Sequence, residues 1–162
     1  MLRLLDRHEL HLVQSIAHQT WPITFAEILT TEQIVYMLDW MYHKTILEKN
    51  YDDGHQFYAY FENNLAIGFM AIQVNLLEGK SLKIHKIYVL PNQQGKGVGY
   101  KLIQKAIEIA NNLEQKNVFL NVNRFNHAVD FYKRVGFSIL KEENIEIGNG
   151  FLMEDYVMLI SV

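Results

Sequence analysis

In the first third of the chain, apolar residues recur at a spacing of three to four positions, which is typical of helices packed on one face. Leu10, Val13 and Ala17 follow this spacing, and Thr31 stands where it can cap a second helix whose apolar face would hold Ile34, Val35, Leu38 and Met41. The pattern predicts a short strand over residues 2–5, a helix over 6–19 and a second helix from 31 toward 48.

From residue 56 onward the sequence shows the short apolar runs and turn residues typical of strands, interrupted by two helical patterns. The pattern predicts strands over 56–61, 65–77, 82–90 and 117–122, helices over 97–112 and 128–135, and two late strands around the turn Gly148-Asn149-Gly150. Gly136 follows the last helix, where glycine commonly ends one. This order indicates a mixed sheet covered by helices.

Composition excludes several classes of protein. The 162 residues are 49% apolar and 20% charged, typical of one globular domain, and we expect a single domain over 1–162. The net charge of −3 argues against a general nucleic-acid surface. The chain has no cysteine, so it has neither disulfides nor a thiolate nucleophile. No apolar run approaches the ~18 residues of a membrane span, and we expect a cytoplasmic protein.

The segment with the clearest chemistry joins a strand end at Val89-Leu90-Pro91 to the helix over 97–112. It contains glycine at three alternate positions, Gly95, Gly97 and Gly99. Glycine lets the backbone turn its N–H groups into one cavity and removes the Cβ atoms that would keep a ligand away. The first N–H groups of a helix lack partners and lie at its positive end, so the segment favours a phosphate or pyrophosphate. A tight turn without a ligand is the alternative.

Two familiar phosphate motifs do not fit this segment. A P-loop requires Gly-Lys followed by Ser or Thr, whereas Gly97 follows Gly95-Lys96. In the dinucleotide fingerprint, a glycine would stand at Tyr100 or Leu102. Two interpretations of the segment therefore stay open, an anion site of another kind and a tight strand-to-helix turn.

Two segments together resemble the GNAT superfamily of N-acetyltransferases. Gln94-x-x-Gly97-x-Gly99 is similar to that family's acetyl-CoA pyrophosphate loop, and the segment from Asn126 to Phe137 is similar to its Asn…Ala…Tyr…Gly-Phe segment. The resemblance covers residues 57–137 well and the flanks only in element order. It implies an α/β (α+β) fold with a mixed, mostly antiparallel sheet of about seven strands flanked by helices.

The resemblance also implies cofactor contacts. The strand before the loop would part from its neighbour and offer backbone groups of Ile87 and Val89, beside Tyr88, to the pantetheine arm of acetyl-CoA. The pyrophosphate would lie against Gln94, Gly95, Lys96, Gly97, Val98, Gly99 and Tyr100. Asn126 would bind the pantetheine region; Asn123 is the alternative, because Asn126 precedes Ala128 by two residues where many members have three.

For the chemistry, the resemblance implies direct acetyl transfer to an amine, with Tyr132 near the sulfur as the acid that protonates the thiolate. A core aromatic is the other interpretation of Tyr132, which also fits the apolar face of its helix. The amine must lose a proton, since an alkyl ammonium has a pKa near ~10. Many members use a carboxylate on the strand before the loop, but His85 stands in that neighbourhood here. A neutral imidazole could be the base, while a structural histidine and deprotonation through water stay open.

Other signals are weaker. His8 and His11 do not have the spacing of a zinc helix motif, and no metal is expected. The early helices and residues 151–158 loosely resemble the polyamine-acetylating branch, so a small polyamine is the first acceptor suggested, with Glu27, Asp39 and the Glu154-Asp155 pair as candidate contacts. The alternatives are a protein or peptide N-terminus or lysine, and a non-catalytic acyl-CoA sensor. We expect a small-molecule amine as partner, neither nucleic acid nor a membrane, and allow for a homodimer.

Overall fold

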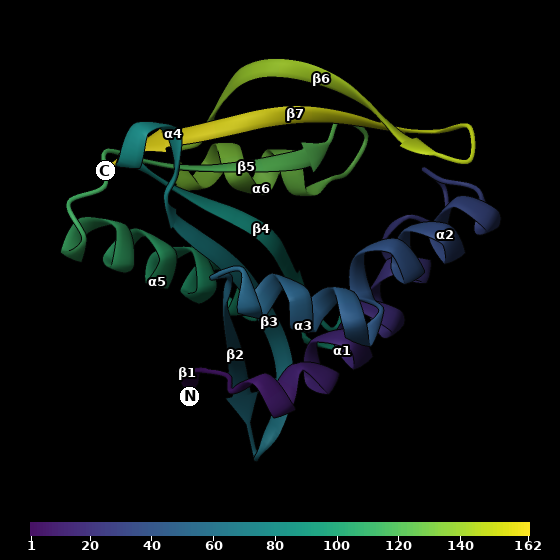
Figure 1. The fold of residues 1–162 in the computed structure, drawn as a ribbon, viewed down its shortest axis with the longest axis horizontal. Coiled ribbons are helices and arrows are strands. Elements are labelled where there is room, and N and C mark those ends of the chain that lie inside the picture. The colour runs from purple at the N-terminus through teal and green to yellow at the C-terminus, as the bar shows by residue number, and fades with distance from the viewer. The chain divides into compact units, whose positions relative to one another are not determined.

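The computed structural model describes all residues, 1–162, and contains seven strands in one sheet of order β1-β2-β3-β4-β5-β7-β6 (Figure 1). The strands are β1 (Leu2–Leu4), β2 (Gln56–Glu62), β3 (Leu65–Asn75), β4 (Ser81–Val89), β5 (Asn117–Asn123), β6 (Ser138–Gly148) and β7 (Phe151–Ser161). The pairs β1–β2, β2–β3, β5–β7 and β6–β7 are antiparallel, and β4–β5 is parallel. This confirms the mixed, mostly antiparallel sheet.

The helices are α1 (Leu10–Thr24), α2 (Thr31–Tyr42), α3 (Lys44–Asp52), α4 (Leu76–Gly79), α5 (Val98–Asn112) and α6 (Ala128–Val135), with 3-10 turns η1 (Arg7–Glu9) and η2 (Pro91–Gln93). No helix is both long and apolar enough to cross a membrane.

Contacts divide the chain into two compact units. The first unit comprises Met1–Gln73 and His85–Lys105, and the second comprises Val74–Ile84 and Ala106–Val162. Strands β3 and β4 and helix α5 each contribute residues to both units.

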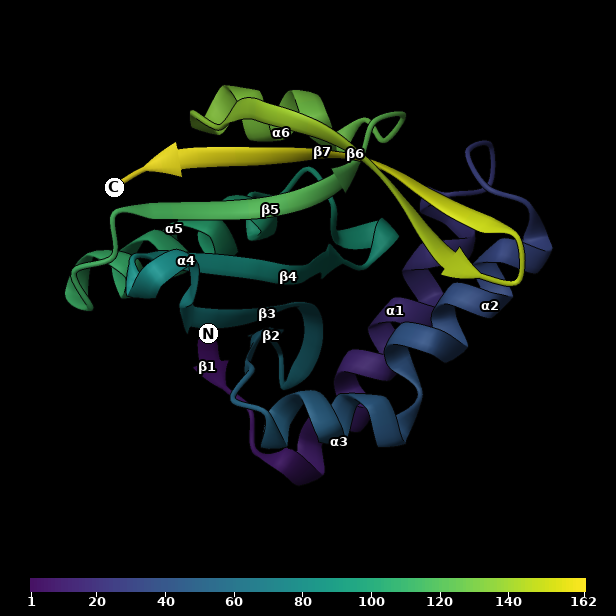
Figure 2. The ribbon, with the colours of Figure 1, turned by 45° about the horizontal axis from the view of Figure 1, so that its top comes forward.

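The core of the first unit lies between the helices α1–α3 and the strands β2 and β3. Its helical part is built from residues at the predicted spacing, among them Val13, Ala17 and Trp21 of α1, all buried. Figure 2 shows α1, α2 and α3 grouped together in this unit. An aromatic cluster joins the elements: Trp21 packs on Phe25, Tyr42 and Tyr88, and Phe69 packs on Tyr42 and Tyr88.

Three details of the helical region differ from the prediction. Helix α1 continues to Thr24, past Pro22 in its last turn, instead of ending at residue 19. The cap of α2 is Thr30, whose hydroxyl accepts from the N–H of Gln33 at 3.1 Å, and not Thr31. The helix expected to reach residue 48 is broken at His43, which has ψ 143° and starts α3 by accepting from the N–H of Thr45.

The buried face of α2 also differs from the prediction. Val35 was expected to face the core but is 62% exposed, whereas Met37 and Tyr42 are buried beside Ile34 and Leu38. Both faces of α2 carry apolar residues, so periodicity alone could not choose between them.

The second unit is built on β5, β7 and β6 with α6. Val118, Leu120 and Met158 are buried on these strands, and α6 contributes Val129 and Tyr132. Gly136, with φ +118°, ends α6 as predicted, and the glycine turn joins β6 to β7 as predicted. The strand expected over 65–77 ends at Asn75, and the short segment α4 follows it, with left-handed backbone angles at Leu77 and Glu78.

Candidate functional site

The loop between β4 and α5 has the open glycine backbone that the sequence suggested. Gly95 and Gly97 have φ of +77° and +80°, and a Cβ added at either would meet no atom within 4 Å. Gly99 lies in the first turn of α5 without a positive φ. The N–H of Lys101 donates to the carbonyl of Gly97 at 3.1 Å, so α5 begins at this loop. At these two glycines the backbone is therefore unobstructed, and it lies beside a helix N-terminus, which suits an anion.

The side chains of this loop are exposed, and two of them bond back to nearby groups. The Gln94 amide nitrogen donates to the carbonyl of Val89 at 3.0 Å, and Lys96 Nζ donates to the Gln93 side-chain oxygen at 2.9 Å. Val98 is buried and anchors the loop, whereas Tyr100 is exposed. Lys96 adds a positive charge to the loop, which favours the same class of ligand.

Close packing of β3 behind the loop depends on Gly68, a residue that the sequence analysis did not single out. A Cβ at Gly68 would lie 3.1 Å from Val98 Cγ1 and 3.3 Å from both the carbonyl oxygen of Tyr88 and Val89 Cγ2. A side chain there would push β3 away from β4 and α5. A glycine inside an apolar strand pattern is the sequence signal that could have identified this contact.

The residues Ile87, Tyr88 and Val89 of β4 are each half-buried. The Tyr88 ring packs on Trp21 and Phe69 at centroid distances of 5.7 and 6.1 Å, so its side chain belongs to the aromatic cluster. The parallel register of β4 on β5 runs from Ser81 opposite Asn117 to Ile84 opposite Leu120, and β4 continues from there to Val89.

His85 lies on the same strand and is half-buried. Its Nε2 is 3.1 Å from the side-chain oxygen of Gln73 on β3, and its ring stacks on that of His55 with centroids 4.2 Å apart. These contacts hold the ring in one orientation, as a base would require. They are equally compatible with a structural histidine.

Tyr132 lies in the second unit, on α6, and its side chain is 6% exposed. Its ring packs edge-to-face on Phe137 with centroids 5.8 Å apart, and contacts the tilted ring of Phe131 at 5.4 Å. Burial raises the pKa of the Tyr132 phenol well above its usual value, because the phenolate would lose its solvation. The phenol is therefore protonated at any working pH and has a proton to donate.

Both candidate asparagines make turns before α6. The Asn126 side-chain oxygen accepts from the N–H of Ala128 at 2.9 Å, and that of Asn123 accepts from the N–H of Phe125 at 2.9 Å. In each case the amide oxygen is engaged, which leaves the amide NH₂ as the group that Asn126 or Asn123 can offer a ligand.

A polar cluster on β4, β5, β6 and β7 of the second unit had been recognised only in part. Asp155 is 4% exposed, and Asn121 donates to its carboxylate at 3.3 Å and to that of Glu143 at 3.0 Å. Burial raises the pKa of Asp155, and burial lowers the pKa of Lys83. Glu154, the other member of the expected acidic pair, is half-buried and lies 3.7 Å from Arg124.

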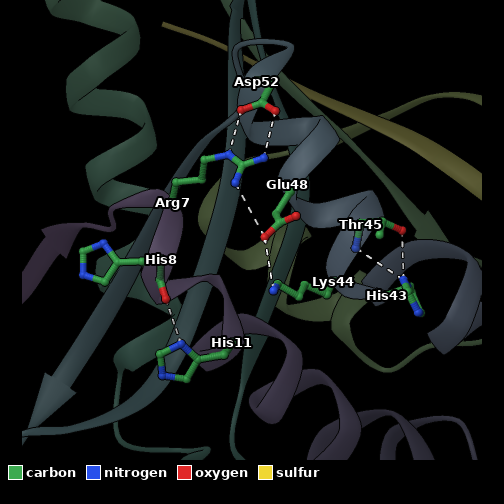
Figure 3. A network of polar contacts seen from close by, with 8 residues as sticks. All are labelled: Arg7, His8, His11, His43, Lys44, Thr45, Glu48 and Asp52. Carbon is green, nitrogen blue, oxygen red and sulfur yellow. Dashed lines mark hydrogen bonds and ion pairs between the residues drawn. The ribbon is translucent and has the colours of Figure 1, made fainter.

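A surface cavity of about 430 Å³ in the first unit lies between η1, α1 and α3. Most of its polar groups bind one another (Figure 3): Arg7 donates to both carboxylate oxygens of Asp52 and lies 3.6 Å from Glu48, and His11 Nδ1 donates to the carbonyl of His8. The Arg7 guanidinium lowers the pKa of Asp52. No three metal-binding side chains come together anywhere in the chain. The contacts of Arg7 with Asp52 and Glu48 connect the N-terminal turn η1 to α3.

Comparison with known proteins decides the family. A model of the acetyltransferase (GNAT) family matches residues 13–137, which include the glycine loop and Tyr132. The chain belongs to the GNAT acetyltransferase family. It is 34% identical over 116 residues to an uncharacterized N-acetyltransferase of Methanocaldococcus jannaschii, covering 68% of this chain and 48% of that protein. It also matches an uncharacterized N-acetyltransferase of Archaeoglobus fulgidus, 40% identical over 72 residues, and the chain spans about half the length of each of these relatives.

Two further N-acetyltransferases resemble the chain more fully in length. A [ribosomal protein bS18]-alanine N-acetyltransferase of Haemophilus influenzae is 28% identical over 124 residues, covering 76% of this chain and 82% of that protein. The PaiA N-acetyltransferase of Thermoplasma acidophilum, solved with coenzyme A, has a TM-score of 0.82 at 22% identity, covering 100% of this chain and 98% of that one. This structural likeness confirms the fold.

Proposed function

We propose that this GNAT protein transfers the acetyl group of acetyl-CoA directly to a primary amine, and that residues 94–100 bind the pyrophosphate of acetyl-CoA. The observation that carries the proposal is the loop geometry. Gly95 and Gly97 adopt left-handed angles with no atom within 4 Å of a Cβ position, immediately before the positive end of α5. A backbone that is open at two glycines beside the positive end of a helix fits a pyrophosphate.

For the pantetheine arm, we propose the backbone groups of Ile87 and Val89. The pairing of β4 with β5 ends at Ile84. The later residues of β4 can therefore direct their backbone N–H and C=O groups to a ligand, which supports this assignment. The carbonyl of Val89 already accepts from Gln94. Since a carbonyl has two lone pairs, it can keep this bond and accept a second.

We propose the following transfer of protons and bonds. A base removes one proton from the ammonium, and the nitrogen lone pair forms a bond to the thioester carbonyl carbon. The C–S bond then breaks, Tyr132 protonates the departing sulfur, and the second proton on nitrogen restores the phenol through solvent. His85 is the base we favour, because it is held in place on β4; transfer to water is the alternative.

As acceptor we propose a small primary amine, with a polyamine as the first choice. The net charge of −3 and two carboxylates on the β6–β7 hairpin, that of the exposed Glu142 and that of the half-buried Glu154, suit a cationic substrate. Arg124 lies 3.7 Å from each carboxylate and offsets part of that charge. A peptide N-terminus is the second candidate, because the Haemophilus influenzae relative is named for an alanine N-terminus of a ribosomal protein.

Thiol release from acetyl-CoA, measured across polyamines, aminoglycosides, amino acids and alanine-initiated peptides, tests the proposal. Turnover with small amines supports it, and turnover with peptides alone selects the second candidate. Acetyl-CoA that binds in calorimetry but releases no thiol with any acceptor would show a non-catalytic sensor.

A further inference from the structure

The contacts of His85 identify which of its ring nitrogens can act as a base. Its Nε2 lies 3.1 Å from the side-chain oxygen of Gln73. An amide oxygen can only accept a hydrogen bond, so Nε2 must carry the hydrogen. In the neutral imidazole the lone pair then lies on Nδ1.

The second contact of His85 is a stack with His55 on the face of its ring. The two imidazole rings are nearly parallel, 17° apart, with centroids separated by 4.2 Å. A proton on one ring disfavours a proton on the other, because two like charges would lie close together in a half-buried place. The stack therefore favours the neutral form of His85, which is the form that accepts a proton.

Strand β4 carries two further charged side chains, Lys83 and Lys86. Lys86 is buried on the opposite face of the strand and donates to Asn50, and Lys83 precedes His85 by two residues on the same face. Lys83 itself lies near Glu143 and Asp155 of the second unit. The carboxylates of Glu143 and Asp155 offset the charge of Lys83, and Lys86 lies on the other face, so His55 is the titratable ring in contact with His85.

We infer that Gln73 and His55 are positioning residues for His85: Gln73 fixes the hydrogen on Nε2, and His55 keeps the ring neutral, so that Nδ1 receives the amine proton. This rests on the proposed acetyltransferase function. The ammonium nitrogen loses the proton and keeps the electron pair, and His85 becomes an imidazolium whose Nε2–H still binds Gln73. After transfer, solvent removes the proton from Nδ1.

The test is Gln73→Glu, which keeps a hydrogen-bond acceptor of the same size but places a carboxylate beside the ring. The pKa of His85 should rise by about one unit. The rise of kcat/KM with pH should then move upward by the same amount, so that the rate below this limb falls about tenfold and the rates converge above it. The matched control is Gln104→Glu, which adds the same charge on the exposed side of α5 and should leave the limb in place.

A second variant, His55→Phe, keeps a stacked aromatic ring but cannot be protonated, and should raise the pKa of His85 by about half a unit. NMR titration of the histidine ring signals, with that of His85 identified by its loss in His85→Gln, measures both shifts without substrate. An unchanged His85 pKa in both variants overturns the inference.

Activity separates this inference from the proposed function. If the wild type acetylates an amine but the limb does not move in Gln73→Glu, the inference alone is wrong. If the NMR shifts occur but the wild type acetylates no amine, the proposed function is wrong, and the use of His85 as a base is wrong with it.

Discussion

Replacing Gly97 with alanine separates ligand binding from backbone strain. The φ of +80° at Gly97 is costly for any residue with a Cβ, so Gly97→Ala should lower the free energy of unfolding by about 1 kcal/mol. For a chain of this size that corresponds to a fall in Tm of about 2–4 °C. The added methyl group meets no protein atom within 4 Å, so the strain is the whole folding effect.

The same methyl group would occupy the space in which we place the pyrophosphate. Displacing the phosphates from one or two backbone N–H groups costs about 1.5–3 kcal/mol, which weakens acetyl-CoA binding roughly 10- to 100-fold. The matched control is Gly79→Ala, since Gly79 has φ +75° and equally open surroundings but lies in α4. It should lose the same stability and bind acetyl-CoA like the wild type.

Calorimetric titration with acetyl-CoA and thermal unfolding of the three proteins make the comparison. Equal binding by Gly97→Ala and Gly79→Ala would refute the placement of the pyrophosphate. A loss of binding in both would show that strain alone is responsible, and would refute it as well.

Three further predictions concern single residues. Tyr132→Phe should leave folding nearly unchanged and lower kcat by about 10²-fold in an assay limited by chemistry, because only the proton donor is removed; an unchanged kcat would make Tyr132 a core residue alone. Gly68→Ala should lower the free energy of unfolding by about 1–3 kcal/mol in denaturant titrations, because its Cβ would lie 3.1–3.3 Å from β4 and α5; a stability equal to that of wild type would contradict this packing. Arg3 holds the pKa of Glu9 at about 2, below its usual value, so this pair stabilises the fold above pH 4.5 and loses its effect as pH falls toward 2. Glu9→Gln should therefore be about 1 kcal/mol less stable than wild type at pH 7, a figure reduced for solvent screening of the pair, and this difference should shrink as pH falls through about 2; a difference that stays constant from pH 7 to pH 2 would contradict the cause.

The sequence predicted those parts of the fold that depend on local chemistry. Helix α5 and its glycine loop, α6 with Gly136, and the hairpin around Gly148-Asn149-Gly150 all follow from periodicity and turn residues close together in the chain. These elements could be predicted without knowing which distant residues they contact.

The break between α2 and α3 could not be read in the same way. Apolar residues continue at helical spacing through His43, and only the backbone angle and the bond from Thr45 end one helix and begin the next. At Val35, the choice of buried face was made by packing against the other elements.

The candidate site shows the same division. Residues 94–100 were identified because loop and helix start are contiguous in sequence. The contacts of Gly68, the hydrogen bond from His85 to Gln73 and the stack on His55 depend on which strands and loops lie side by side. These contacts join residues far apart in the sequence, so the spacing of residue types along the chain does not predict them.

The most direct test of the central claim is a crystal structure of the protein with acetyl-CoA. We expect the pyrophosphate oxygens to lie about 2.7–3.2 Å from backbone nitrogens of residues 95–100, with Gly95 and Gly97 keeping their positive φ. A pyrophosphate bound elsewhere, with these N–H groups facing solvent, would contradict the assignment of this loop as the acetyl-CoA site.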